Sequence, residues 1–140
     1  MNSYTVYQIQ TQSKLPNYEE GKVYEVLRRF SDFEWLLGKL QENEHYKGMI
    51  IPPLPQKKYL GNLSSEFVEL RRQELETFLR VIASHAVMRH DLQLKEFLTF
   101  ADQFEKYKTN PSAYERAWGY MEYIPSVKNI SMNSVKSAIQ

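Results

Sequence analysis

Two adjacent arginines and a phenylalanine stand where a strand-like pattern gives way to a helical one. In EVLRRFSDFEWLLGKL (residues 25–40), Arg28, Arg29 and Phe30 separate the two patterns. A guanidinium group binds phosphate or carboxylate through paired, charge-assisted hydrogen bonds, and a helix N-terminus adds free N–H groups. The corner could therefore bind an anion, although a charged strand end exposed to water would give the same pattern. Because strand side chains alternate, we expect at most one of the two arginines to serve a given site.

A third arginine interrupts the apolar face of a later helix pattern. Phe67, Leu75, Phe78, Leu79 and Ile82 recur at helical spacing, and Arg71 falls on the same line. Burying an unpaired charge is costly. Arg71 must therefore reach the surface, pair with a carboxylate or face an anionic ligand, and the pattern leaves these options open.

The first half of the chain predicts the elements that position these residues. Residues 4–12 and 22–30 are rich in Val, Ile, Tyr and Thr, which is typical of a pair of antiparallel strands. Ser31 and Glu34 match a capping box, so we expect a helix to begin at Ser31. The segment IIPPLPQKKYLGNL (50–63) contains three prolines and predicts an extended, polyproline-like path.

Two further helices follow the proline segment. Ser64 or Ser65 is the expected cap of a helix over residues 66–84, and Asp91 the expected cap of the next. Residues 101–140 change in character, and we expect a helical or partly disordered extension there.

Composition restricts the function further. The 140 residues include 42% hydrophobic residues, no cysteine, and a net charge of +1, which disfavours a general nucleic-acid binder. The three histidines lack matched carboxylates, and no nucleophile elbow, phosphate-binding glycine loop or metal spacing is present. We therefore expect no catalytic residue, metal or cofactor, and no enzyme activity.

Three motifs in order carry a resemblance. RRFSDFEWL, PPLPQK and FVELRRQELETFL resemble those of the phox-homology (PX) domain, over about residues 4–100. With TQSKLP in the first hairpin, the chain looks like the BAR-containing sorting nexins, although residues 101–140 are too few for a BAR domain. The resemblance implies an α+β fold, in which a small antiparallel sheet packs on a helical subdomain with a polyproline-rich loop. Two of the three family strands are visible; we expect residues 1–100 to form the domain without the family's first strand.

The resemblance also implies a site for phosphatidylinositol 3-phosphate. Arg29 corresponds to the residue that binds the 3-phosphate, and Phe30 to the aromatic that stacks under the inositol ring. Ser31 lies where a hydroxyl or the helix amides reach that phosphate. Lys57 corresponds to the lysine near the 1-phosphate, and Arg71 to the arginine that hydrogen-bonds the 4- and 5-hydroxyls.

A membrane-inserting loop is the last feature that the resemblance implies. It would carry Tyr59 and Leu60, although Leu60 could equally belong to the core. These features predict a cytoplasmic adaptor, peripheral on the early endosome membrane, which sorts proteins with trafficking-complex partners or another sorting nexin. The alternatives are a PX-like scaffold that binds cargo or coat proteins with little lipid binding, and a PxxP ligand of Src-homology-3 domains.

Overall fold

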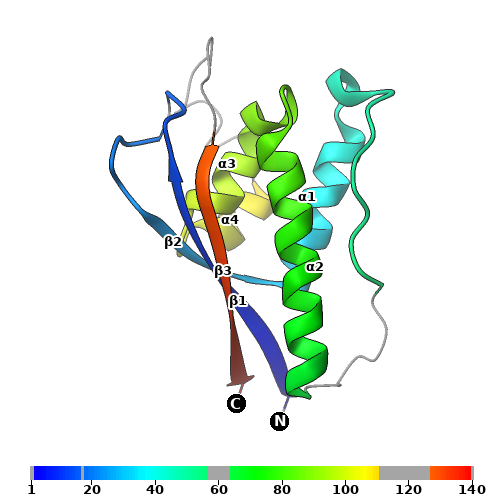
Figure 1. The fold of residues 1–140 in the computed structure, drawn as a ribbon, viewed down its shortest axis with the longest axis vertical. Helices are drawn as coiled ribbons and strands as arrows, with labels where there is room; N and C mark the ends of the chain where they lie inside the picture. Colours follow the sequence, from blue (N-terminus) through cyan, green and yellow to red (C-terminus); the bar gives the residue numbers. More distant parts are fainter. Residues whose placement is uncertain (1, 17, 57–63, 111–126, 140) are drawn as a thin grey trace.

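A three-stranded antiparallel sheet lies beside a group of helices (Figure 1). The computed structural model describes residues 2–16, 18–56, 64–110 and 127–139. The strands are β1 (Asn2–Ser13), β2 (Tyr24–Arg29) and β3 (Val127–Ile139), in the order β2-β1-β3. The α-helices are α1 (Phe30–Glu42), α2 (Ser65–Ser84), α3 (Leu92–Thr99) and α4 (Phe104–Thr109), with short 3-10 turns η1 (Glu44–Tyr46) and η2 (Met88–His90). This confirms the α+β fold class.

The strand pair predicted from the first thirty residues is confirmed. β1 and β2 pair antiparallel, with Tyr7 opposite Arg28 and Ile9 opposite Val26. Tyr7, Ile9 and Val26 are buried in the main core, because the helices cover this face of the sheet.

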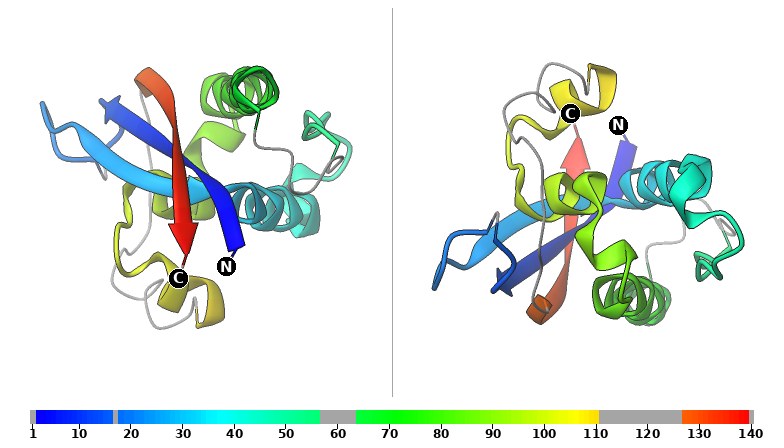
Figure 2. Two further views of the ribbon diagram at one scale, coloured as in Figure 1. Left: turned by 90° about the horizontal axis from the view of Figure 1, so that it is seen from below. Right: turned by 90° about the horizontal axis from the view of Figure 1, so that it is seen from above.

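The third strand comes from the C-terminal part of the sequence. β3 pairs antiparallel with the other edge of β1, from Asn2 opposite Ile139 to Ser13 opposite Val127 (Figure 2). For residues 127–139 the structure thus differs from the expected helical or partly disordered extension. The physical reason is non-local: the edge of β1 offers a row of N–H and C=O groups, and a strand that pairs with them satisfies both sets.

The cap of α1 also differs from the prediction. The helix begins at Phe30, and Arg29 is its N-cap residue. Asp32, not Glu34, reaches back, and its Oδ2 accepts a hydrogen bond from the Arg29 N–H at 2.7 Å. Ser31 therefore lies in the first turn with an exposed side chain and does not cap the helix.

The other two caps agree with the sequence. The Ser64 hydroxyl accepts from the Phe67 N–H at 3.3 Å at the start of α2. The Asp91 carboxylate accepts from the Leu94 N–H at 2.9 Å at the start of α3.

The main core continues past residue 100, the predicted end of the domain. Phe104 and Tyr107 of α4 are buried in the same cluster as Phe33 of α1 and Phe97 of α3. Trp35 packs edge-on against both α4 rings, with centroids at 5.2 Å from Phe104 and 5.8 Å from Tyr107. Helix α4 is therefore packed as part of the same unit.

Candidate functional site

The two adjacent arginines point to opposite faces of β2, as strand alternation predicts. Arg28 is 2% exposed, whereas Arg29 is exposed. The Arg28 guanidinium donates to the carbonyl oxygens of Phe97 at 2.9 Å and Leu27 at 2.8 Å, and also to that of Phe100. Burial lowers the pKa of Arg28 to about 10, and nearby Asp32 opposes that shift. Arg28 thus stays charged at neutral pH and ties β2 to the end of α3.

Arg29 and Phe30 form the corner between β2 and α1. Arg29 ends the strand in an extended conformation and places its side chain at the helix N-terminus. Phe30 is the first residue of α1, and its half-buried ring packs against the main core. Ser31 follows on the exposed side of the same turn. A cationic group, an aromatic ring and the amide end of a helix are therefore adjacent.

Arg71 joins this corner from α2. Its guanidinium carbon lies 4.1 Å from the centroid of the Phe30 ring and 5.2 Å from that of Phe67. A guanidinium over an aromatic face is attracted by the ring quadrupole. Because Arg71 covers one face of the Phe30 ring, that face is not available for another group to stack on.

The same arginine reaches the proline segment. The Arg71 Nη2 donates to the Gln56 carbonyl oxygen at 2.6 Å. Among the described residues, Arg71 forms no ion pair with a carboxylate. Arg72, by contrast, pairs along its own helix with Glu69 at 2.8 Å and Glu76 at 3.4 Å. The sequence left three options for Arg71: to reach the surface, to pair with a carboxylate or to face an anionic ligand. Within the described part of the chain, the structure excludes the carboxylate.

A buried ion pair supports the corner from behind. Asp32 is 4% exposed, and its Oδ1 lies 2.6 Å from the Lys108 Nζ of α4. Although burial lowers the pKa of Lys108, its hydrogen bonds to Asp32 and Glu105 raise that pKa overall. Lys108 therefore neutralises the carboxylate that caps α1, and the positive end of the helix dipole is not cancelled by an unmatched negative charge.

The structure brings Arg29, Phe30 and Arg71 into one region, with Ser31 at its rim. Lys57, Tyr59 and Leu60 lie outside the described residues. Gln56, the chain neighbour of Lys57, contacts Arg71.

Two contributors to this region escaped the sequence analysis. They are the Gln56 carbonyl and the Asp32–Lys108 pair. Asp32 carried a signal, since an acid at the third helical position commonly accepts from the N-cap amide. Lys108 carried none, because its partner is 76 residues away.

The proline segment lies against α2. Pro52, Pro53, Leu54 and Pro55 line a cavity of about 330 Å³, with Glu74, Thr77 and Phe78 on the other wall. The segment thus has packing partners within the domain.

Two absences hold for the residues that the structure describes. No described helix combines the length and the apolar character needed to cross a membrane. Within the same ranges, no three His, Cys, Asp or Glu side chains are grouped so that they could hold a metal ion.

Several known proteins are similar to this chain in sequence, and one solved structure is similar to it in fold. The sequence model of one family, the PX domain, matches residues 16–101. Over 108 residues, the chain is 40% identical to sorting nexin-1 of Homo sapiens, covering 70% of this chain and 20% of that protein. It is 39% identical over 108 residues to vacuolar protein sorting-associated protein vps5 of Schizosaccharomyces pombe, covering 77% of this chain and 18% of vps5. The chain thus spans about a fifth of the length of these relatives.

One solved structure also belongs to a PX domain. The X-ray structure of a designed CISK-PX domain is similar at a TM-score of 0.56 and 34% sequence identity, covering 69% of this chain and 84% of that one.

Proposed function

Because the chain belongs to the PX domain family, we propose that it binds phosphatidylinositol 3-phosphate at the corner between β2 and α1. In this proposal Arg29 binds the 3-phosphate, with Ser31 and the first-turn amides of α1 beside it. Phe30 stacks on the inositol ring through the face that Arg71 does not cover. Lys57 binds the 1-phosphate, and Arg71 donates to the 4- and 5-hydroxyls.

One observation carries the proposal. The Arg71 guanidinium lies 4.1 Å from the Phe30 ring centroid and 2.6 Å from the Gln56 carbonyl oxygen, beside the N-terminus of α1. These contacts hold Arg71 in place before any ligand arrives, so little side-chain entropy is lost on binding. The stacked guanidinium also keeps donors for hydroxyl oxygens, because only Nη2 contacts Gln56.

The names of the relatives support a proposed biological role. Their names describe sorting nexins and a vacuolar protein sorting factor. The protein is then a non-enzymatic, peripheral membrane adaptor of protein sorting, recruited from the cytoplasm to early endosomes with trafficking partners. Tyr59 and Leu60 would add membrane insertion. A single headgroup site of micromolar affinity gives about 8 kcal/mol, so stable residence requires insertion or a second contact.

Liposome co-sedimentation tests the site. Wild type should pellet with vesicles that contain phosphatidylinositol 3-phosphate, and not with vesicles that contain no phosphoinositide or another one. Arg29→Ala should weaken pelleting at least tenfold, since a charge-assisted bidentate contact is lost. Arg80→Ala is the matched control, because Arg80 lies on α2 with its side chain 54% exposed and has a weak 3.9 Å pair with Glu76.

Either of two outcomes would contradict the proposal. If folded wild type pelleted with none of the phosphoinositide vesicles, the result would favour a protein-binding scaffold instead. Equal loss in Arg29→Ala and Arg80→Ala would indicate general attraction to anionic vesicles. Circular dichroism of each variant separates loss of the site from loss of the fold.

A further inference from the structure

Within the described ranges, no strand pairs with the outer edge of β2, on the side away from β1. In the three-stranded sheet, β2 is an edge strand, and its one neighbour among the described strands is β1. The Arg28 Nη1 donates to the Leu27 carbonyl at 2.8 Å, and the Arg29 N–H donates to Asp32 at 2.7 Å. The Leu27 carbonyl and the Arg29 N–H therefore bond to side chains and not to the backbone of β1. Because backbone groups alternate along a strand, Glu25 and Leu27 direct their N–H and C=O groups outward.

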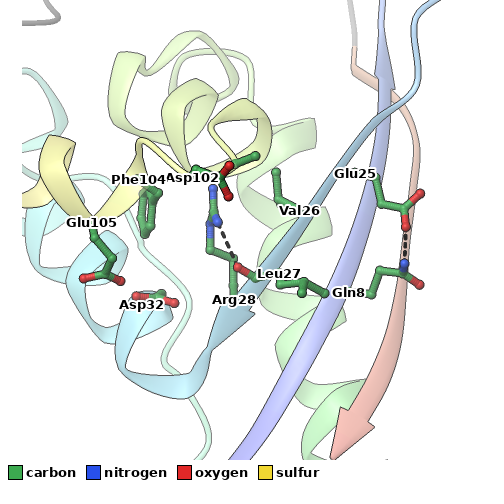
Figure 3. A pocket seen from close by; sticks show the side chains of 10 residues that line it. Gln8, Glu25, Val26, Leu27, Arg28, Asp32, Asp102, Phe104 and Glu105 are labelled. Atoms are coloured by element: carbon green, nitrogen blue, oxygen red, sulfur yellow. Dashed lines mark hydrogen bonds between the residues drawn. The ribbon is translucent and has the colours of Figure 1, made fainter. Parts of the chain in front are cut away.

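A cavity of about 600 Å³ runs along this edge (Figure 3). Four consecutive residues of β2, from Glu25 to Arg28, line it. Its far wall is formed by Asp32, Ala101, Asp102, Phe104 and Glu105. Side chains from both faces of the strand contribute: Arg28 points toward Phe104 and Asp102, while Glu25 lies toward Gln8 (Figure 3). A cavity that includes both faces of one strand is open at the strand edge itself.

The lining is negatively charged. Four of its ten residues are acids and one is a base. That base, Arg28, is 2% exposed and directed at backbone carbonyls, so its charge is shielded from the cavity. Lys108 matches Asp32 and Glu105, which leaves Glu25 and Asp102 as the main negative groups that no cation pairs with in the lining. The Glu25 carboxylate accepts hydrogen bonds from the side-chain amides of Gln8 and Gln10, which are neutral and leave its charge in place.

An apolar side chain stands next to this charge. Leu27 is 56% exposed and lies two residues from Glu25, on the same face of the strand. A strand added at this edge would therefore face an acid and an apolar side chain in turn on its outer side. It would face Asp102 on its inner side.

We infer that this edge binds an extended, basic peptide segment of a partner protein, through strand addition to β2. Backbone pairing with the Glu25 N–H and C=O and with the Leu27 N–H would hold the segment, because the Leu27 carbonyl already accepts from Arg28. Lysine or arginine side chains would meet Glu25 on one face of the strand or Asp102 on the other. A basic segment is the partner that the charge of the lining favours, since four of the ten lining residues are acids and the one base is buried. Arg29 lies on the same face of β2 as Glu25 and Leu27, at the end of the strand. The inference does not rest on the lipid site proposed above, which uses the corner between β2 and α1.

The test uses defined peptides and the whole 140-residue chain without lipid. The probe is an acetylated and amidated hexapeptide that alternates valine and arginine, and its control alternates valine and glutamate. Titration of ¹⁵N-labelled protein should shift the amide signals of Glu25 and Leu27 with the arginine peptide and leave them unchanged with the glutamate peptide. Shifts centred elsewhere, or equal responses to both peptides, would overturn the inference.

Charge reversal on the protein gives the second arm. Glu25→Lys combined with Asp102→Lys should weaken arginine-peptide binding at least tenfold. Glu44→Lys, an exposed change on η1 outside the cavity, should change it less than twofold. If Glu44→Lys weakened binding equally, the effect would come from the net charge of the protein and not from this cavity. Arg29→Ala removes a positive charge from the same face of β2 and should not weaken binding of the arginine peptide; a loss that matches its loss of lipid binding would mean that the two sites are one.

Backbone pairing is tested with methylated probes. An extended peptide directs the N–H groups of valines to one edge and those of arginines to the other. Methylating one set should abolish binding, and methylating the other should not. Unchanged affinity of both methylated peptides would refute strand addition.

Discussion

The ion pair between Asp32 and Lys108 offers the sharpest test of how α4 supports the binding corner. The Asp32 carboxylate accepts from the Arg29 N–H at 2.7 Å and from the Lys108 Nζ at 2.6 Å. Asp32 is 4% exposed, whereas the Lys108 side chain is 18% exposed. We expect both contacts to stabilise the fold, since the carboxylate would otherwise be a buried, unmatched charge.

The magnitude can be worked from these contacts. A hydrogen bond to a charged group contributes about 1.5–3 kcal/mol, and breaking a fully buried pair costs roughly 3–5 kcal/mol. Lys108 keeps Glu105 at 2.9 Å and some contact with water, so the lower figure applies. Asp32→Asn should therefore lower the free energy of unfolding by about 2 kcal/mol. Asp32→Ala also loses the helix cap, which adds about 1 kcal/mol.

A double-mutant cycle isolates the pair. Urea unfolding followed by circular dichroism would be measured for Asp32→Asn, Lys108→Met and the double variant. We expect a coupling energy of about 1.5 kcal/mol, within the range found for residues in direct contact. Lys39→Met is the matched control: its pair with Glu42 is 3.6 Å long and exposed, so its loss should cost less than about 0.5 kcal/mol.

The reasoning would be refuted by a coupling energy below about 0.5 kcal/mol, the size expected of independent sites. That result would mean that Lys108 interacts mainly with Glu105 and solvent. Helix α4 would then be held by its aromatic contacts alone.

Three further predictions concern the frame around the site. Ser64→Ala should lower the free energy of unfolding by about 1 kcal/mol, since α2 loses its cap; an unchanged urea midpoint would contradict this. Burial raises the pKa of Asp91 above its ordinary 3.8, so the stability that its protonated form contributes is present below pH 3.8 and lost as pH rises through the folded-state pKa. The free energy of unfolding of Asp91→Asn minus that of wild type should therefore increase as pH rises from 3 to 7. A difference that does not change with pH would contradict this. Ending the chain after Asn110 removes β3 and exposes the edge of β1, so size-exclusion chromatography should show self-association and thermal melting a lower midpoint; a stable monomer would show that β3 is dispensable.

Local signals in the sequence determined much of the frame. Strand composition predicted the β1–β2 pair, and Ser64 and Asp91 predicted the starts of α2 and α3. Alternation along β2 predicted that Arg28 and Arg29 diverge, because the pleat imposes a period of two on any strand. Each of these depends on a few neighbouring residues, so the chain itself carries the information.

Other features depend on contacts between distant residues, and only the tertiary structure decided them. β3 pairs with β1 across more than a hundred residues, although its own sequence has no clear strand pattern. Asp32 replaced Ser31 and Glu34 at the α1 cap, in a position where Lys108 also neutralises it. Arg71 had open options in the sequence, and the stacking on Phe30 arises because α2 passes the start of α1. The acidic cavity beside β2 likewise exists only once residues 101–105 fold back beside the sheet. For β3, Arg71, Lys108 and the cavity beside β2, the deciding partner lies far away in the chain, where no local pattern can specify it. The Asp32 cap itself had a local signal.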